Sequence, residues 1–143
     1  NSFHQFFKDL NKILVEYPSL WKYDYNPDGF KWLVVDDNLQ SVFSYARFDD
    51  HGNAIVVACN FIGNSHEDYT IPVPFAGSYK EILNSDKDIY TGGNYTNTRA
   101  VRSKKGQCLN EENSIKIKLA PFSACIFEYK KPEIKKRNVK KKK

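Results

Sequence analysis

The feature that most constrains the fold is a series of seven short segments rich in β-branched and aromatic residues. Asp, Asn, Gly and Pro separate the segments, and this pattern is typical of strands joined by turns. Seven such strands in 143 residues favour one antiparallel β-sandwich with an adequate core. The expected strands are residues 30–35, 41–48, 54–61, 69–75, 79–83, 114–119 and 122–129.

The composition of individual segments places them in the sheets. Residues 54–61 (AIVVACNF) are nearly all apolar, so this strand should lie in the interior of a sheet. Residues 114–119 alternate polar and apolar side chains, which predicts one solvated face. Pro72 and Pro74 confine their strand to a sheet edge, because proline cannot complete a ladder on both sides. The polar segment 84–113 should hold one or two short strands within a loop.

A helical periodicity precedes the strands. Apolar side chains recur at helical spacing over residues 3–17, which predicts one amphipathic helix. Ser2 followed by Gln5 resembles a capping box, and Pro18 should end the helix. The fold class is therefore mainly β, an antiparallel β-sandwich preceded by one α-helix. A lone helix ahead of an all-β unit suggests the last element of a preceding domain, on which its three phenylalanines would pack.

The net charge of +5 is distributed unevenly along the chain. Residues 130–143 hold nine Lys or Arg and one Glu, whereas the preceding 129 residues hold 13 Lys or Arg and 16 Asp or Glu. Blocks of like charge stay solvated and rarely fold, so we expect a disordered tail. A polyanion-binding role for the tail stays open. The acidic body lacks the interleaved aromatic and basic residues of single-strand binders, which argues against nucleic acid as a partner.

The cysteines and the chain start indicate the compartment. Three cysteines form no Cys-x-x-Cys motif, and Cys59 and Cys125 lie in apolar segments, so reduced thiols in a cytoplasmic protein are expected. No run of 18 apolar residues could span a membrane, and no signal peptide opens the chain. The chain starts at Asn1 and contains no Met, so we expect a processed chain or an excised fragment.

The sequence contains no recognisable catalytic, metal or cofactor motif. The three histidines are scattered away from the cysteines, and neither a nucleophile elbow nor a phosphate-binding loop is present. The paired carboxylates lie in turns, where Asp commonly bonds its own backbone, so we predict no catalytic residue. These pairs are Asp36–Asp37, Asp49–Asp50 and Glu111–Glu112.

One segment, DYNPDGFKW, is a candidate binding site. Phe30 and Trp32 are two apart on one strand, so both rings share one face. Such rings suit the flat apolar side of a hydroxylated ligand, while the carboxylates and amides nearby could bond hydroxyl groups. The alternative is that Phe30 and Trp32 form core against a neighbouring domain.

Several segments in order carry a family resemblance. They are KDLNKILVEYPSLWKYDYNPDGFKW, VVACNF, EDYTIPVPFAGSYKEILNSD and TGGN. Together they resemble the C-terminal end of bacterial 1,4-α-glucan branching enzymes, which belong to the α-amylase clan. The resemblance covers residues 4–130, and its most specific parts are Asp-x-x-Pro-x-Gly-Phe-x-Trp and Ile-Leu-Asn-Ser-Asp.

The resemblance implies a domain plan. Residues 1–20 would be the last helix of an upstream (β/α)8 catalytic barrel, 21–29 the junction, and 30–129 the C-terminal β-sandwich domain. The parent enzyme would cleave an α-1,4 link of a glucan and transfer the segment to a 6-hydroxyl. The catalytic carboxylates of such enzymes come from the barrel, so this chain should be inactive alone. Its partners would be that barrel and a glucan. Trp32 would be the first candidate for the glucan contact, with Phe30, Tyr23 and Tyr25 as secondary ones.

Two alternatives stay open. The chain could be a stand-alone carbohydrate-binding module, although an independent module would not carry a Phe-rich helix face. It could also be the C-terminal domain of a debranching or amylase relative, because these share the same sandwich.

Overall fold

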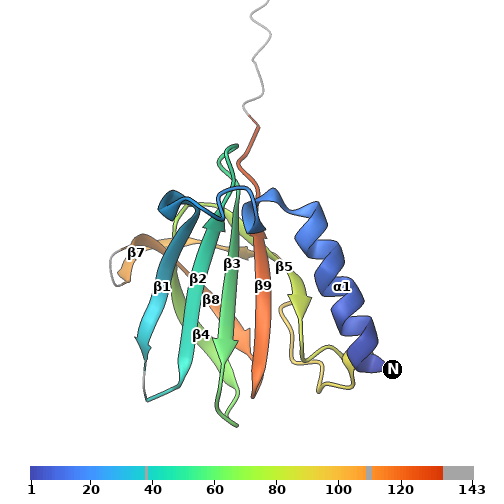
Figure 1. The fold of residues 1–143 in the computed structure, drawn as a ribbon. Helices are drawn as coiled ribbons and strands as arrows, with labels where there is room; N and C mark the ends of the chain where they lie inside the picture. The colour runs from blue at the N-terminus through green and yellow to red at the C-terminus, as the bar shows by residue number, and fades with distance from the viewer. Residues whose placement is uncertain (38, 109–110, 134–143) are drawn as a thin grey trace, which may run out of the picture.

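The computed structural model describes residues 1–37, 39–108 and 111–133. These residues form a two-sheet antiparallel β-sandwich with one α-helix beside it (Figure 1). The predicted fold class is confirmed. The tail expected to be disordered over 130–143 lies outside the described residues from 134 onward.

The larger sheet consists of β1 (Phe30–Asp37), β2 (Val42–Phe48), β3 (Ala54–Asn60), β5 (Ser78–Asn84), β6 (Val101–Arg102) and β9 (Ser123–Tyr129). Its strand order is β1-β2-β3-β9-β5-β6. The apolar strand β3 therefore lies in the interior of the sheet, as its composition predicts. Strand β9, which comes last among the strands, pairs with β3 on one side and β5 on the other.

The smaller sheet has the order β4-β8-β7. Its strands are β4 (His66–Val73), β8 (Glu111–Leu119) and β7 (Lys104–Cys108). Strand β4 lies at an edge, as Pro72 within it requires, and Pro74 directly follows the strand. Side chains of β8 alternate between buried and exposed over Ser114–Leu119, which confirms the predicted solvated face. Strands β6 and β7 are the short strands expected within 84–113.

The main core lies between the two sheets. Val56 and Phe127 of the larger sheet and Ile71, Ile115 and Ile117 of the smaller one are almost completely buried there. Because side chains alternate along a strand, burying this set turns the other set of the larger sheet outward. The outward face is where the helix and the candidate site lie.

Helix α1 (Ser2–Glu16) begins one residue earlier than predicted. The predicted capping box is wrong. The Asn1 side chain accepts a hydrogen bond from the Phe3 amide at 3.0 Å, and the Gln5 side chain donates to Asp9 at 2.9 Å instead of reaching back. Asn is as good an N-cap as Ser, so the residue before Ser2 satisfies the free amides. The helix ends at Glu16, before Pro18, as predicted.

The helix packs on the sandwich itself. Its side chains Phe6, Leu10, Ile13 and Tyr17 join a second apolar cluster with residues of β3, β5 and β9, and α1 runs beside β5 in Figure 1. This corrects part of the expectation for the phenylalanines, since Phe6 is covered by the sheet. A second stripe remains exposed, and it consists of Phe3, Phe7, Leu14 and Val15.

Candidate functional site

The connection from α1 to β1 is held in place by a hydrogen bond and an ion pair to β2. It contains two 3-10 helices, η1 (Pro18–Leu20) and η2 (Pro27–Gly29). The Arg47 guanidinium donates to the Leu20 carbonyl at 3.2 Å and forms an ion pair with Asp24. Because Arg47 belongs to β2, these bonds fix the connection to the larger sheet.

The Pro-Asp-Gly turn sets the direction in which β1 starts. The Asn26 side chain accepts a hydrogen bond from the Asp28 amide at 2.9 Å and caps η2. Gly29 is buried against Tyr23, where an added Cβ would lie 2.3 Å from the Tyr23 Cβ. Only glycine allows this close approach. The turn therefore places the Phe30 side chain on the outer face of the sheet.

Five aromatic side chains form one surface on β1, β2 and the residue after β3, which we call the aromatic face. Phe30 stacks on Tyr45 with ring centroids 5.2 Å apart, and Trp32 meets Phe30 edge to face at 5.0 Å. Trp32 also contacts Phe43 and Tyr45 at 6.1 and 6.0 Å, and Phe43 stacks on Phe61 at 5.0 Å. Trp32 is 53% exposed and Phe61 56%. A surface of half-exposed stacked rings can contact a flat apolar ligand or another protein surface.

The structure brings together two of the four residues singled out from the sequence. Phe30 and Trp32 share one face, as their spacing predicts. The Tyr23 side chain lies against Gly29 instead, and Tyr25 is fully exposed.

Sequence reasoning missed three members of the aromatic face, Phe43, Tyr45 and Phe61. The alternation of residues 42–45 could have shown that Phe43 and Tyr45 share one face of their strand, since Val42 and Ser44, which alternate with them, are buried. The pairing of Trp32 with Tyr45 was needed to place them beside Trp32.

Two ionisable side chains at the aromatic face have a raised pKa. Burial raises the pKa of the Tyr45 phenol and that of the Cys59 thiol. Cys125 is buried, and burial raises the pKa of its thiol as well. Cys59 and Cys125 are free cysteines, which fits the apolar role expected of them.

The carboxylate of Asp49 accepts hydrogen bonds from backbone amides of its own turn. It accepts hydrogen bonds from the His51 and Asn53 amides at 2.9 Å each. Burial alone would raise the pKa of Asp49, but the hydrogen bonds from Asn53 and His51 more than offset it and lower the pKa. A carboxyl bound in this way stabilises a turn and is poorly placed to act as an acid or a base.

The prediction that the carboxylate pairs lie in turns is wrong for Asp37, which ends β1, and for Glu111, which starts β8. Both carboxyl groups nevertheless have partners. Asp37 accepts from the Gln40 amide at 3.2 Å, and Glu111 pairs with Lys31. Residues 1–37, 39–108 and 111–133 contain no group of three or more His, Cys, Asp or Glu side chains that could hold a metal ion.

Tyr90 and Tyr95, which lie on either side of Gly92 and Gly93, have separate partners. Tyr90 turns to the helix, where its ring meets Phe6 edge to face at 5.1 Å and its hydroxyl donates to Asp9. Tyr95 lies under the Lys118 ammonium, 5.7 Å from the ring centroid.

A family model decides the classification. The model described as "Alpha amylase, C-terminal all-beta domain" matches residues 32–130. The chain belongs to this family. The match begins at Trp32 and ends just after β9, so it covers all the strands of the alpha amylase C-terminal all-beta domain except the start of β1.

Curated relatives match a longer part of the chain than the family model does. The chain is 44% identical over 122 residues to the "1,4-alpha-glucan branching enzyme GlgB" of Prochlorococcus marinus strain MIT 9515, which is 85% of this chain and 16% of the relative. It is 36% identical over 126 residues to "GlgB 1" of Clostridium perfringens strain 13, 87% of this chain and 19% of the relative. The branching enzyme of Pseudomonas fluorescens strain Pf0-1 is 36% identical over 126 residues, 88% of this chain and 17% of the relative. The chain thus spans less than a fifth of the length of these relatives.

No helix in the described part of the chain is both long and apolar enough to cross a bilayer.

Proposed function

We propose that this chain is the C-terminal accessory domain of a 1,4-α-glucan branching enzyme. The observation that carries the proposal is the identity of 36 to 44% with branching enzymes over at least 85% of the chain. The parent enzyme would cleave an α-1,4 link of a glucan and transfer the freed segment to a 6-hydroxyl, which makes an α-1,6 branch.

The chemistry would reside in the remainder of the parent enzyme. Retaining cleavage needs a carboxylate nucleophile and a carboxylic acid about 5 Å apart. Asp49 and Glu111 are instead occupied by their turn amides and by Lys31 respectively. The role of this domain would be to support the catalytic barrel and to contact glucan.

The two apolar sides of α1 suit a helix between two domains. One side packs on the sandwich through residues such as Ile13. The other side exposes Phe3, Phe7, Leu14 and Val15. Exposed apolar patches of this kind mark interaction sites, and the proposed occupant is the upstream barrel of the same polypeptide. Residues 1–20 would then be the last helix of the barrel, 21–29 the junction and 30–129 the C-terminal domain.

The aromatic face is the proposed glucan contact, with Trp32 at its centre. A half-exposed indole backed by Phe30, Phe43 and Tyr45 offers a rigid flat surface to a sugar ring. Tyr25, which is fully exposed, and Tyr23 are secondary candidates near the same connection. The alternative occupant of the aromatic face is the barrel, and the Trp32 variant described in the Discussion separates the two.

A cytoplasmic location is part of the proposal. The free thiols of Cys59 and Cys125 support it, because disulfides are rare in that compartment.

The direct test is the activity of the longer polypeptide that contains this chain. We expect it to introduce α-1,6 branches into amylose, detected as new branch-point protons by NMR and as a loss of iodine staining. Hydrolysis of amylose without new branch points would instead favour an amylase relative. Removal of existing branch points would favour a debranching enzyme.

A further inference from the structure

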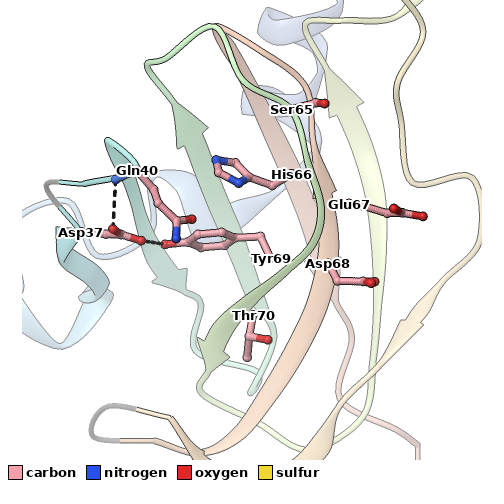
Figure 2. Close-up of a pocket in the computed structure, with 8 residues that line it drawn as sticks. All are labelled: Asp37, Gln40, Ser65, His66, Glu67, Asp68, Tyr69 and Thr70. Carbon is pink, nitrogen blue, oxygen red and sulfur yellow. Dashed lines mark hydrogen bonds between the residues drawn. The ribbon is translucent and has the colours of Figure 1, made fainter.

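A cleft of about 550 Å³ lies where the end of β1 and its following turn face the start of β4 (Figure 2). Asp37 and Gln40 line it from the β1 side, and His66 and Tyr69 line it from β4. Asp37 ends β1, whereas Trp32 lies near the start of that strand. The cleft is therefore distinct from the aromatic face.

An irregularity in β4 aims two rings into this cleft. In a regular strand, residues three apart point to opposite faces. The pairing of β4 with β8 shifts register between His66 and Tyr69, and Figure 2 shows both rings extending to the side on which Asp37 lies. Their centroids are 5.3 Å apart, while Glu67 and Asp68 point away from them. Bulges commonly redirect side chains in this way beside functional sites.

The polar groups of the cleft are held in place by one another. The Tyr69 hydroxyl donates to one oxygen of Asp37, and the Gln40 backbone amide donates to the other at 3.2 Å. Gln40 and Tyr69 both line the cleft (Figure 2). The buried Nε2 of His66 has no hydrogen-bond partner among the described residues, and a buried polar atom of this kind calls for an explanation.

The charges of the cleft limit the ligands that it can take. Its lining residues include Asp37, Glu67 and Asp68 and neither Lys nor Arg. Such a lining repels anions, which excludes phosphorylated sugars and nucleotides. No cluster that could hold a metal ion exists in the described part of the chain. Among uncharged ligands a polyol fits this lining, because aromatic rings suit the C–H faces of a sugar and carboxylate and amide groups suit its hydroxyls.

We propose that this cleft is a second glucan-contact site of the domain. The rings of Tyr69 and His66 form its apolar wall, and Asp37 and Gln40 bond sugar hydroxyls. This inference rests on the proposed function, because the substrate of that function is a glucan, which is a neutral polyol.

The test measures glycogen affinity of the complete parent enzyme carrying Gln40→Ala or Asp37→Asn. Gln40 is exposed and Asp37→Asn keeps an acceptor for the turn amide, so both variants should fold. Gln40→Ala removes one sugar bond, so we expect the dissociation constant from retardation in glycogen gels to rise about five-fold. Asp37→Asn replaces a charge-assisted bond to the sugar by a weaker neutral one, so the dissociation constant should rise by a smaller factor. The matched control is Glu112→Gln on an exposed position of β8, which should stay within about two-fold of wild type.

Two further measurements make every outcome decisive. Unchanged retardation in both cleft variants, with melting temperatures equal to wild type, overturns the second site. Branching of amylose by the unmodified enzyme is measured on the same preparation. Absence of branching would reject the proposed function, while the retardation series would still decide whether the cleft contacts glycogen.

Discussion

The two halves of the outer face of the larger sheet are covered in different ways. Over β3, β5 and β9, helix α1 lays Ile13 and its neighbours on Ile55 and Ile126, and these side chains are buried. Over β1 and β2, the rings of the aromatic face pack on one another and Trp32 stays half exposed. The fully buried side chains of the first half are aliphatic, whereas the second half consists of aromatic rings that stay partly exposed. The difference suggests that the first half serves stability and the second serves contacts.

Replacing Ile13 by Ala should have the largest effect on this comparison. Ile13 is 7% exposed in the helix-covered half, and an Ile→Ala change at a buried site costs about 3 kcal/mol of unfolding free energy. Urea unfolding of the chain measures it. Val15→Ala on the exposed side of the same helix is the control and should change the free energy by less than about 0.5 kcal/mol. Equal effects of the two changes would show that α1 does not pack on the sheet.

The turn at Asp49 joins β2 of the aromatic half to β3 of the helix-covered half. Removal of the Asp49 carboxylate should have the second-largest effect on the free energy of unfolding. Asp49→Ala leaves the amides of His51 and Asn53 without an acceptor, which should cost about 2 kcal/mol in urea unfolding. Asp49→Asn keeps an acceptor and should cost less.

The lowered pKa of Asp49 adds a pH dependence to the same prediction. A carboxyl whose pKa is lower in the folded state binds more protons when unfolded, so stability rises with pH. Its contribution is complete above the ordinary value of 3.8 and is lost as the pH falls through the lower folded pKa. Asp49→Asn should remove this part of the acid dependence. An acid unfolding curve of Asp49→Asn that coincides with that of wild type would contradict it.

Trp32→Ala tests the open half. In the parent enzyme, loss of the indole should weaken glycogen binding about five-fold, with a melting temperature close to wild type, because Trp32 is half exposed. Retardation in glycogen gels and calorimetry measure the two quantities. A large fall in melting temperature with normal affinity would assign the aromatic face to the barrel interface.

Phe7→Ala should have the smallest effect on the chain alone. Phe7 is 47% exposed, and its loss should change the unfolding free energy of the 143-residue chain by less than about 0.5 kcal/mol. The same change in the parent enzyme should lower the melting temperature if the barrel covers the exposed stripe of α1. An equal, small effect in both contexts would remove the support for this interface.

Local patterns were enough to predict the elements of the fold. The place of three strands could be predicted, from the alternation in residues 114–119, the apolar run of 54–61 and Pro72 in β4. Side-chain period and proline geometry act within one segment, so no distant contact was needed. The partner of α1 was harder to predict. Periodicity identifies which residues of a helix are apolar, but it does not reveal that Phe6 and Phe7 face different surroundings.

The candidate site was predictable only where it depended on neighbours in sequence. Phe30 and Trp32 lie on one strand, so their spacing placed them together. Phe43, Phe61 and the cleft residues depend on strand register. The pairing of Trp32 with Tyr45 and the shift between His66 and Tyr69 arise from contacts distant in sequence. Asn1 was missed as the N-cap because Ser2 offers the same capping chemistry one residue later.

The position of β9 has a consequence for the order in which the chain folds. This strand is made after the others, yet it joins β3 to β5 in the middle of the larger sheet. Until β9 emerges from the ribosome, no strand pairs the β1-β2-β3 ladder with the β5-β6 pair. Helix α1 then also lacks part of the apolar surface on which it packs. Closure of the sandwich must therefore follow synthesis of its last strand, as expected of sheets with many distant pairings. A premature stop a few residues before Ser123 should consequently abolish the whole sheet instead of trimming its edge.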